Sequence, residues 1–110
     1  MDKEASIAKI RLHLAEQFNL PKDQIDSMLP SFIATLESHM GNLEKSLLEE
    51  DHVLIGKAGH TIKGAFLNLG LHDCAELALA IEEKGRVGAT YQDFKKSIEE
   101  LRSLLQPILE

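Results

Sequence analysis

One histidine, His60, occupies a position from which an imidazole can act as a nucleophile on a helix surface. At about 100° per residue, the apolar residues around it gather on one side of the helix, and His60 points away from them. Gly56 lies one turn before it and Gly64 one turn after it, on the same outer face. Each glycine inside a helix costs about 0.5–1 kcal/mol relative to alanine. Two of them predict an imidazole that stands clear of other side chains, where the active site of another protein can close over it.

Two further residues of this segment add chemistry to the same face. Lys63 is a near neighbour of His60 on the helix surface. Its ammonium can screen charge on a phosphoryl group attached to the ring, and it disfavours the imidazolium form. Leu67 is an apolar residue that a partner can contact. Gly59 lies on the opposite side, where it lets a neighbouring helix come close. Taken singly, an exposed histidine, lysine or leucine is ordinary; the combination with two glycines is what indicates a site.

The elements that must position these residues are helices, because apolar residues recur three and four positions apart along almost the whole chain. We expect helices over about residues 3–18, 22–49, 52–69 and 72–84, and a last one from about 91 to near the C-terminus. Strand-like alternation of useful length is missing from the sequence. The predicted fold class is all-α. We expect one domain, 1–110, in which an antiparallel four-helix bundle over about 22–109 carries an accessory helix at 3–18 that caps one end.

Caps and helix breakers define the expected boundaries. Asp51 is the expected N-cap of the third helix, and Gly70 is expected to end it. Pro30 removes a backbone donor inside the second segment, so we expect a kink or a fresh helix start near it. Residues 85–88, with a glycine at each end, are expected to form the turn before the last helix. Pro107 should weaken the final turn of that helix.

The acidic balance of the chain narrows the range of partners. A net charge of −6 argues against nucleic acid and anionic membranes, because both select clustered Lys and Arg. No apolar run approaches the roughly 20 residues that cross a bilayer, and the polar first residues lack the apolar core of a signal peptide. Cys74 is the single cysteine, so no disulfide forms within the chain. We expect a soluble, cytoplasmic protein with a protein partner.

The stretch from His60 to Gly70, HTIKGAFLNLG, resembles the signature of histidine-containing phosphotransfer (HPt) domains. In that family a histidine is followed by two residues, a lysine or arginine, a glycine and an Asn-x-Gly-like end. Acidic residues 49–51 precede the motif, a Leu- and Ala-rich helix with two adjacent acids follows it, and a long helix closes the chain. The resemblance covers roughly residues 29–109. The first helix, 3–18, departs from the minimal pattern of the family.

The resemblance implies roles for individual residues. Nε2 of His60 would take a phosphoryl group from an aspartyl phosphate on a receiver domain and give it to an aspartate on another receiver. Lys63 matches the cation of the family's motif, and Gly64 matches the small residue that allows docking. Family members also use a Glu or Gln on the next helix to hold Nδ1 of the histidine. By position that residue should be Glu82, with Glu83 as the alternative if the register differs by one.

The sequence supports Glu82 independently of the resemblance. Leu71, Ala75 and Ala78 form an apolar seam that Glu82 ends at helical spacing. Burying a carboxylate without a partner is expensive. His60 Nδ1–H or the ammonium of Lys63 could satisfy it.

A phosphotransfer domain of this kind is expected to lack an ATP site and a cofactor and to bind other signalling proteins. It has no GxxxxGK[ST] loop, so we expect a phosphotransfer carrier without an ATP site of its own and not an enzyme. We expect no bound cofactor, with magnesium and the acceptor carboxylate on the partner. The expected partners are a response-regulator receiver domain, a hybrid sensor histidine kinase, or both. We expect a monomer that docks through Gly56, Lys57, Gly64 and Leu67.

Three alternatives stay open on the sequence. The bundle could be a docking module whose His60 is never phosphorylated, or the phosphoacceptor domain of a chemotaxis-type kinase rather than a free-standing relay protein. A metal- or haem-binding bundle is disfavoured, because its candidate ligands have no i, i+3 or i, i+4 pairing. Those candidates are His13, His39, His52 and His72.

Overall fold

The computed structural model describes residues 2–110, and these residues form five α-helices and no strand. The helices are α1 (Lys3–Phe18), α2 (Lys22–Leu48), α3 (His52–Asn68), α4 (His72–Val87) and α5 (Tyr91–Leu109). This arrangement confirms the all-α fold class, with a four-helix bundle and an additional N-terminal helix. Within the described part of the chain, no helix combines the length and the apolar character that crossing a bilayer requires.

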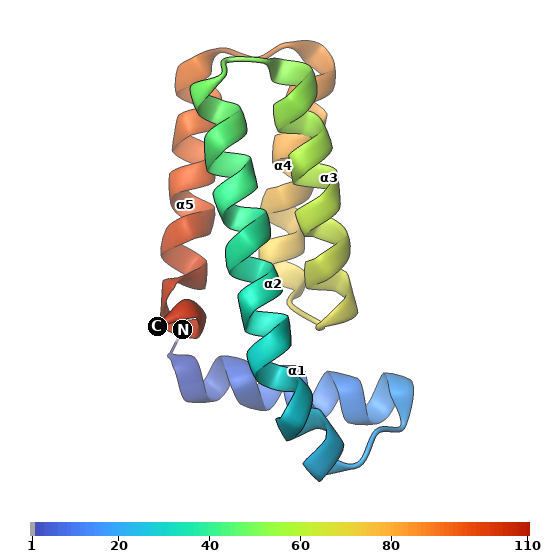
Figure 1. Cartoon of the computed structure of the whole chain (residues 1–110). Helices are drawn as coiled ribbons and strands as arrows, with labels where there is room; N and C mark the ends of the chain where they lie inside the picture. The colour runs from blue at the N-terminus through green and yellow to red at the C-terminus, as the bar shows by residue number, and fades with distance from the viewer. Residues whose placement is uncertain (1) are drawn as a thin grey trace.

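Four helices run side by side and the first crosses their end (Figure 1). In the bundle, α3 packs most extensively on α4, α2 packs on α3 and α5, and α4 packs on α5, so the four helices form a closed ring of neighbours. Helix α1 contacts α2 and α5. Short turns join consecutive helices, which makes neighbours in the bundle antiparallel.

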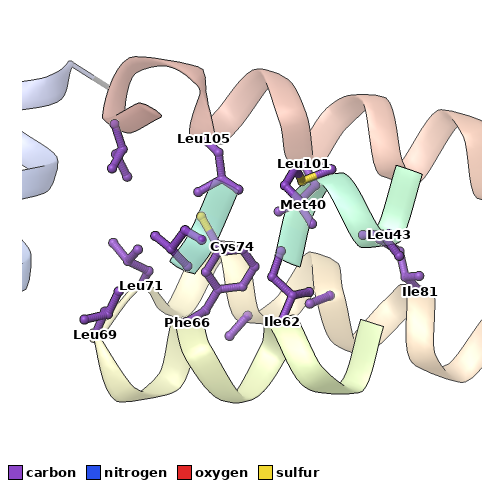
Figure 2. Close-up of a cluster of buried hydrophobic side chains, with 14 of the residues drawn as sticks. Met40, Leu43, Ile62, Phe66, Leu69, Leu71, Cys74, Ile81, Leu101 and Leu105 are labelled. Carbon is purple, nitrogen blue, oxygen red and sulfur yellow. The ribbon is translucent and has the colours of Figure 1, made fainter. Parts of the chain in front are cut away.

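Buried aliphatic side chains from all five helices fill the interior. Figure 2 shows Phe66 of α3 and Cys74 of α4 pointing into the same space as Leu105 of α5. Burial raises the pKa of the Cys74 thiol to about 11, as expected for a small buried hydrophobe rather than a reactive nucleophile. The apolar side of α3 that the sequence predicted is the side that faces this core. Its residues Ile55, Ile62, Phe66 and Leu69 are buried, and Ala58 and Ala65 are partly buried.

Most of the expected helix ends are confirmed. Oδ1 of Asp51 accepts hydrogen bonds from the backbone N–H groups of Val53 and Leu54, at 2.9 and 3.3 Å, so it caps α3. The hydroxyl of Thr90 caps α5 in the same way. Gly70 follows the C-terminus of α3 with a φ of +74°, a backbone conformation that costs little only for glycine.

Two boundary expectations are wrong. Of the kink or fresh start expected near Pro30, the fresh start is wrong: α2 continues through this exposed residue, where water can hydrate the carbonyl that loses its donor. Residues 85–87 are not a turn: α4 runs to Val87, and the left-handed residue that ends it is Gly88 alone, with a φ of +73°. Gly85 is therefore a buried residue of a helix, packed against α3.

Helix α1 is anchored to the opposite end of the α3–α4 hairpin from Gly88. The ring of His13 lies against Gly70, so close that a methyl group added at Gly70 would lie 2.5 Å from its Cγ. The same ring meets the edge of His72 at the start of α4. An Arg11–Asp26 ion pair also joins α1 to α2.

An ion-pair network joins α5 to α2 along the outside of the bundle. Arg102 donates from Nε to Glu44, at 3.0 Å, and from Nη1 to Glu37, also at 3.0 Å. The hydrogen bonds to Glu44 and Glu37 raise the pKa of Arg102 above its already high ordinary value, so the cation is fixed. Two carboxylates on one guanidinium hold the two helices in register.

Candidate functional site

His60, Lys63 and Glu82 form one hydrogen-bonded group across α3 and α4. Nδ1 of His60 lies 2.7 Å from Oε2 of Glu82, and Nζ of Lys63 lies 2.6 Å from Oε1 of the same carboxylate. Glu82 comes from the α4 seam that the sequence singled out, and its side chain is only 9% exposed. Both groups predicted to pair with this carboxylate, Nδ1 of His60 and the ammonium of Lys63, are within hydrogen-bond distance of it. Glu83, the alternative, is exposed.

The charge on Glu82 decides which nitrogen of His60 carries the proton. The hydrogen bond from Lys63 lowers the pKa of Glu82 below its ordinary value, and the contact with His60 adds to this effect against the cost of burial. An ionised carboxylate only accepts hydrogen bonds. Nδ1 of His60 must therefore donate, which leaves the lone pair of the neutral ring on Nε2.

The His60 ring is open to solvent on one flank. Its side chain is 67% exposed, as the sequence predicted, whereas that of Lys63 is 22% exposed. A methyl group added at Gly64 would meet no atom within 4 Å, so this glycine leaves free space beside the ring. Lys57 and Leu67, the other predicted docking residues, are exposed on the same helix.

The prediction of open space at Gly56 is wrong. This residue faces α4, where a methyl group added to it would lie 3.3 Å from Cα of Gly85 and 3.6 Å from the carbonyl oxygen of Glu82. Its missing side chain is explained by a close contact between helices rather than by exposure of the ring. Gly59 was expected to make such a contact, and it does: an added methyl group would lie 3.2 Å from the backbone nitrogen of Glu82.

Arg86 is a member of the site that sequence reasoning missed. Its Nη2 lies 3.6 Å from Oε2 of Glu82, one turn earlier on α4, and its side chain is 71% exposed. Its spacing of four residues from Glu82 could have identified it, because such residues are neighbours on a helix. The expectation of a turn at residues 85–88 excluded that contact. Arg86, Lys57 and His60 line a hollow of about 630 Å³ between α3 and α4. The charged groups of this hollow other than the buried Glu82 are cationic, so a phosphoryl group on His60 would meet positive charge.

An apolar groove adjoins the Gly64 flank of His60, on the side away from α4. It has a volume of about 980 Å³ and lies between the end of α1, the middle of α2 and the outer face of α3. Gly64 and Thr61, both close to His60, form its border on α3, and the exposed ring of Phe18 contributes from α1. The sequence could not indicate this groove, because it exists only where α1 crosses the bundle.

A family model for the Hpt domain matches residues 27–109 of the chain. The chain belongs to the Hpt domain family. As an Hpt domain, it has a fold and a sequence that imply histidine phosphotransfer in two-component signalling. The match starts within α2, so helix α1 lies outside the part of the chain that the Hpt family model covers.

Neither the search of curated proteins nor the search of solved structures found a match. For the alternative of a metal centre, residues 2–110 contain no group of three or more His, Cys, Asp or Glu side chains placed to hold a metal ion. One candidate ligand of this Hpt domain, His52, instead binds the backbone. Its Nδ1–H donates a hydrogen bond to the carbonyl oxygen of Gly85, at 2.8 Å, because a carbonyl only accepts.

Proposed function

We propose that this chain is a phosphorelay intermediate, which accepts a phosphoryl group on His60 from the aspartyl phosphate of a receiver domain, or from a kinase, and passes it to another receiver. The observation that carries the proposal is the exposed His60 ring whose Nδ1–H is held by the ionised carboxylate of Glu82. This arrangement directs the nucleophilic lone pair outward on Nε2. Positioning and charge screening are what phosphoryl transfer chiefly needs.

The bond changes are balanced without a proton leaving the ring. Nε2 of His60 attacks phosphorus, the Nε2–P bond forms, and the bond between phosphorus and the aspartyl oxygen breaks, which returns the donor as a carboxylate. Because Nδ1 keeps its proton, the phosphorylated ring carries positive charge, and Glu82 stabilises that charge at 2.7 Å. Onward transfer is the reverse sequence with a second receiver carboxylate. A magnesium ion bound by the receiver would neutralise charge on the phosphoryl oxygens.

Two cations of this chain would assist the transfer. Lys63 neutralises Glu82 before phosphorylation, and its ammonium lies on the same helix face as the ring, one turn away. Arg86 is largely exposed at the rim of the hollow that His60 lines. Its guanidinium would rotate from Glu82 toward phosphoryl oxygens, for which its planar set of donors is well suited.

The receiver would dock over the open flank of His60. Gly64 leaves space beside the ring, the apolar groove of α1, α2 and α3 lies next to it, and Leu67 offers further apolar surface two turns along α3. Lys57 and Arg86 give this part of an acidic chain local positive charge. A receiver, whose phosphorylation site is built from carboxylates, is complementary to that charge. We propose that the chain acts in this way as a cytoplasmic monomer, as a carrier without an ATP site.

A transfer assay with a phosphorylated receiver tests the proposal. Wild-type protein should acquire an acid-labile, base-stable label, and His60→Gln should acquire none. His72→Gln is a matched control, since it removes an exposed histidine at the start of α4 that lines neither the hollow nor the groove beside His60. Labelling of His60→Gln, or no labelling of the wild type by any receiver or kinase of the same source, would contradict the assignment and favour a docking module that is never phosphorylated.

A further inference from the structure

The backbone of Glu82 lies between two glycines of α3. A methyl group added at Gly59 would lie 3.2 Å from the amide nitrogen of Glu82 and 3.3 Å from the carbonyl oxygen of Ala78. One added at Gly56 would lie 3.6 Å from the carbonyl oxygen of Glu82. At Gly59 the nearest atom is Cγ2 of the Ile81 side chain, at 3.1 Å, but the two backbone atoms lie almost as close. Any larger residue at these positions would therefore also press on the backbone that carries the orienting carboxylate, which no rotamer change can relieve.

A third glycine, on α4, makes the closest of these contacts. A methyl group added at Gly85 would lie 2.5 Å from Cα of Gly56 and 2.9 Å from both the nitrogen of Gly56 and the carbonyl oxygen of His52. All three atoms belong to the backbone of α3, so no rotamer change relieves them. The hydrogen bond from Nδ1 of His52 to the carbonyl oxygen of Gly85 ties the same two helices together at this level. The two backbones are thus in direct contact one turn from Glu82.

This spacing decides whether Glu82 can reach the ring. Restoring an ordinary contact distance at Gly85 after adding a methyl group requires α4 to move by roughly 1 Å. The Nδ1–Oε2 distance is 2.7 Å, so the same movement would carry it beyond about 3.2 Å, the usual limit of an N–H···O hydrogen bond. The carboxylate would then no longer hold the proton on Nδ1.

We propose that Gly56, Gly59 and Gly85 are positioning residues for His60: their backbone contact sets the distance between α3 and α4 at which Glu82 fixes the proton of His60 on Nδ1. The effect on transfer rests on the proposed function. The effect on the proton does not, because the position of the proton is a property of the unphosphorylated protein.

The experiment records ¹⁵N and ¹H NMR signals of the His60 ring in the full chain at a pH at which the ring is neutral. The wild type should carry its ring proton on Nδ1. Gly85→Ala should move the proton partly or wholly to Nε2. Gly59→Ala and Gly56→Ala should weaken the Nδ1–H signal to a smaller extent. All three variants should retain the circular dichroism of a helical protein. Phosphoryl transfer should fall by about 10- to 100-fold in Gly85→Ala and less in the other two, as expected for a displacement of this size.

Gly41→Ala is the matched control. It also adds a methyl group to a helical glycine, on α2, but no atom lies within 4 Å of that methyl group, so the ring signals and the transfer rate should be those of the wild type. If Gly85→Ala does not fold, Gly56→Ala decides: its closest contact of 3.3 Å needs a shift of only a few tenths of an ångström, which lengthens the Nδ1–Oε2 hydrogen bond without breaking it and should move the Nδ1–H signal away from its wild-type position. Wild-type ring signals in the folded glycine variants would overturn the proposal. Failure of the wild type to accept phosphate would instead remove the proposed function and leave the result on the ring proton standing.

Discussion

Nζ of Lys63 lies 2.6 Å from Oε1 of Glu82, although the two residues come from different helices. The ammonium is thus already paired before any phosphoryl group arrives. It keeps Glu82 ionised at a position where its side chain is nearly buried, and an ionised Glu82 is what orients His60. Under the proposed function, Lys63 would therefore act on His60 through the carboxylate, in addition to the charge screening that the sequence motif implies.

Replacing Glu82 by glutamine should remove a pH-dependent part of the stability. The pKa of Glu82 is lowered in the folded protein from an ordinary value of 4.5, chiefly by Lys63. Its ionised form therefore stabilises the fold above pH 4.5, and this contribution is lost as the pH falls through the lower, folded pKa. Urea unfolding from pH 7 to pH 3 should show wild type more stable than Glu82→Gln above pH 5, with the difference shrinking below pH 4.5. A difference that does not change with pH would contradict the role of the charge.

A large side chain at Gly64 should block docking and leave the fold intact. The space beside this residue is free, so Gly64→Tyr has no atom to displace within the chain, but the new ring covers the approach to His60. Transfer from a phosphorylated receiver should fall by about 10-fold or more while the thermal midpoint stays within a few degrees of the wild type. Gly41→Tyr is the matched control, because it adds the same ring to an equally open glycine of α2. Equal transfer rates in the two variants would show that receivers approach His60 from elsewhere.

Alanine at Gly70 should cost stability for two separable reasons. The left-handed backbone there costs an L-residue about 1–2 kcal/mol, and the new methyl group would also collide with the ring of His13. In a His13→Ala background only the backbone cost should remain. A double-mutant cycle by urea unfolding should therefore give a smaller penalty for Gly70→Ala without His13 than with it. Equal penalties would mean that α1 is not held against this turn.

Replacing Arg102 by methionine should weaken the attachment of α5 to α2 without affecting transfer. Methionine keeps the apolar stem and loses both carboxylate contacts, to Glu44 and Glu37. Since both carboxylates are partly exposed, the loss should be about 1 kcal/mol and should diminish in 1 M salt. Arg11→Met, which breaks a single exposed pair with Asp26, should cost less than half as much. A larger loss of unfolding free energy in Arg11→Met than in Arg102→Met would show that the network is no stronger than an ordinary surface ion pair.

The residues of the site were predictable where one helix alone determines their placement. His60 follows from the apolar face of α3, and Glu82 follows from the position of a carboxylate at the end of an apolar seam. Such inferences need only the 3.6-residue period. The helix ends at Asp51 and Gly70 were predictable in the same way, because capping depends on neighbouring backbone.

What the sequence could not predict depends on where the other helices lie. Gly56 and Gly64 stand about 40° to either side of His60 on a helix, so the helical period makes them equivalent. Only the position of α4 distinguishes them, since it covers the flank of Gly56 and leaves that of Gly64 open. Gly85 was misinterpreted for a related reason. Two glycines near a helix end suggest a turn, but close packing against α3 keeps the first of them helical.

All the residues that hold His60 come from α3 and α4, two helices joined by a turn of three residues, 69–71. Contacts between segments so near in sequence have a low contact order, which favours rapid folding. The reactive group is therefore the part of the molecule that a chain leaving the ribosome, or recovering from heat, can reassemble soonest. The more distant docking of α1 and α5 would then stabilise a geometry that the helical hairpin already encodes.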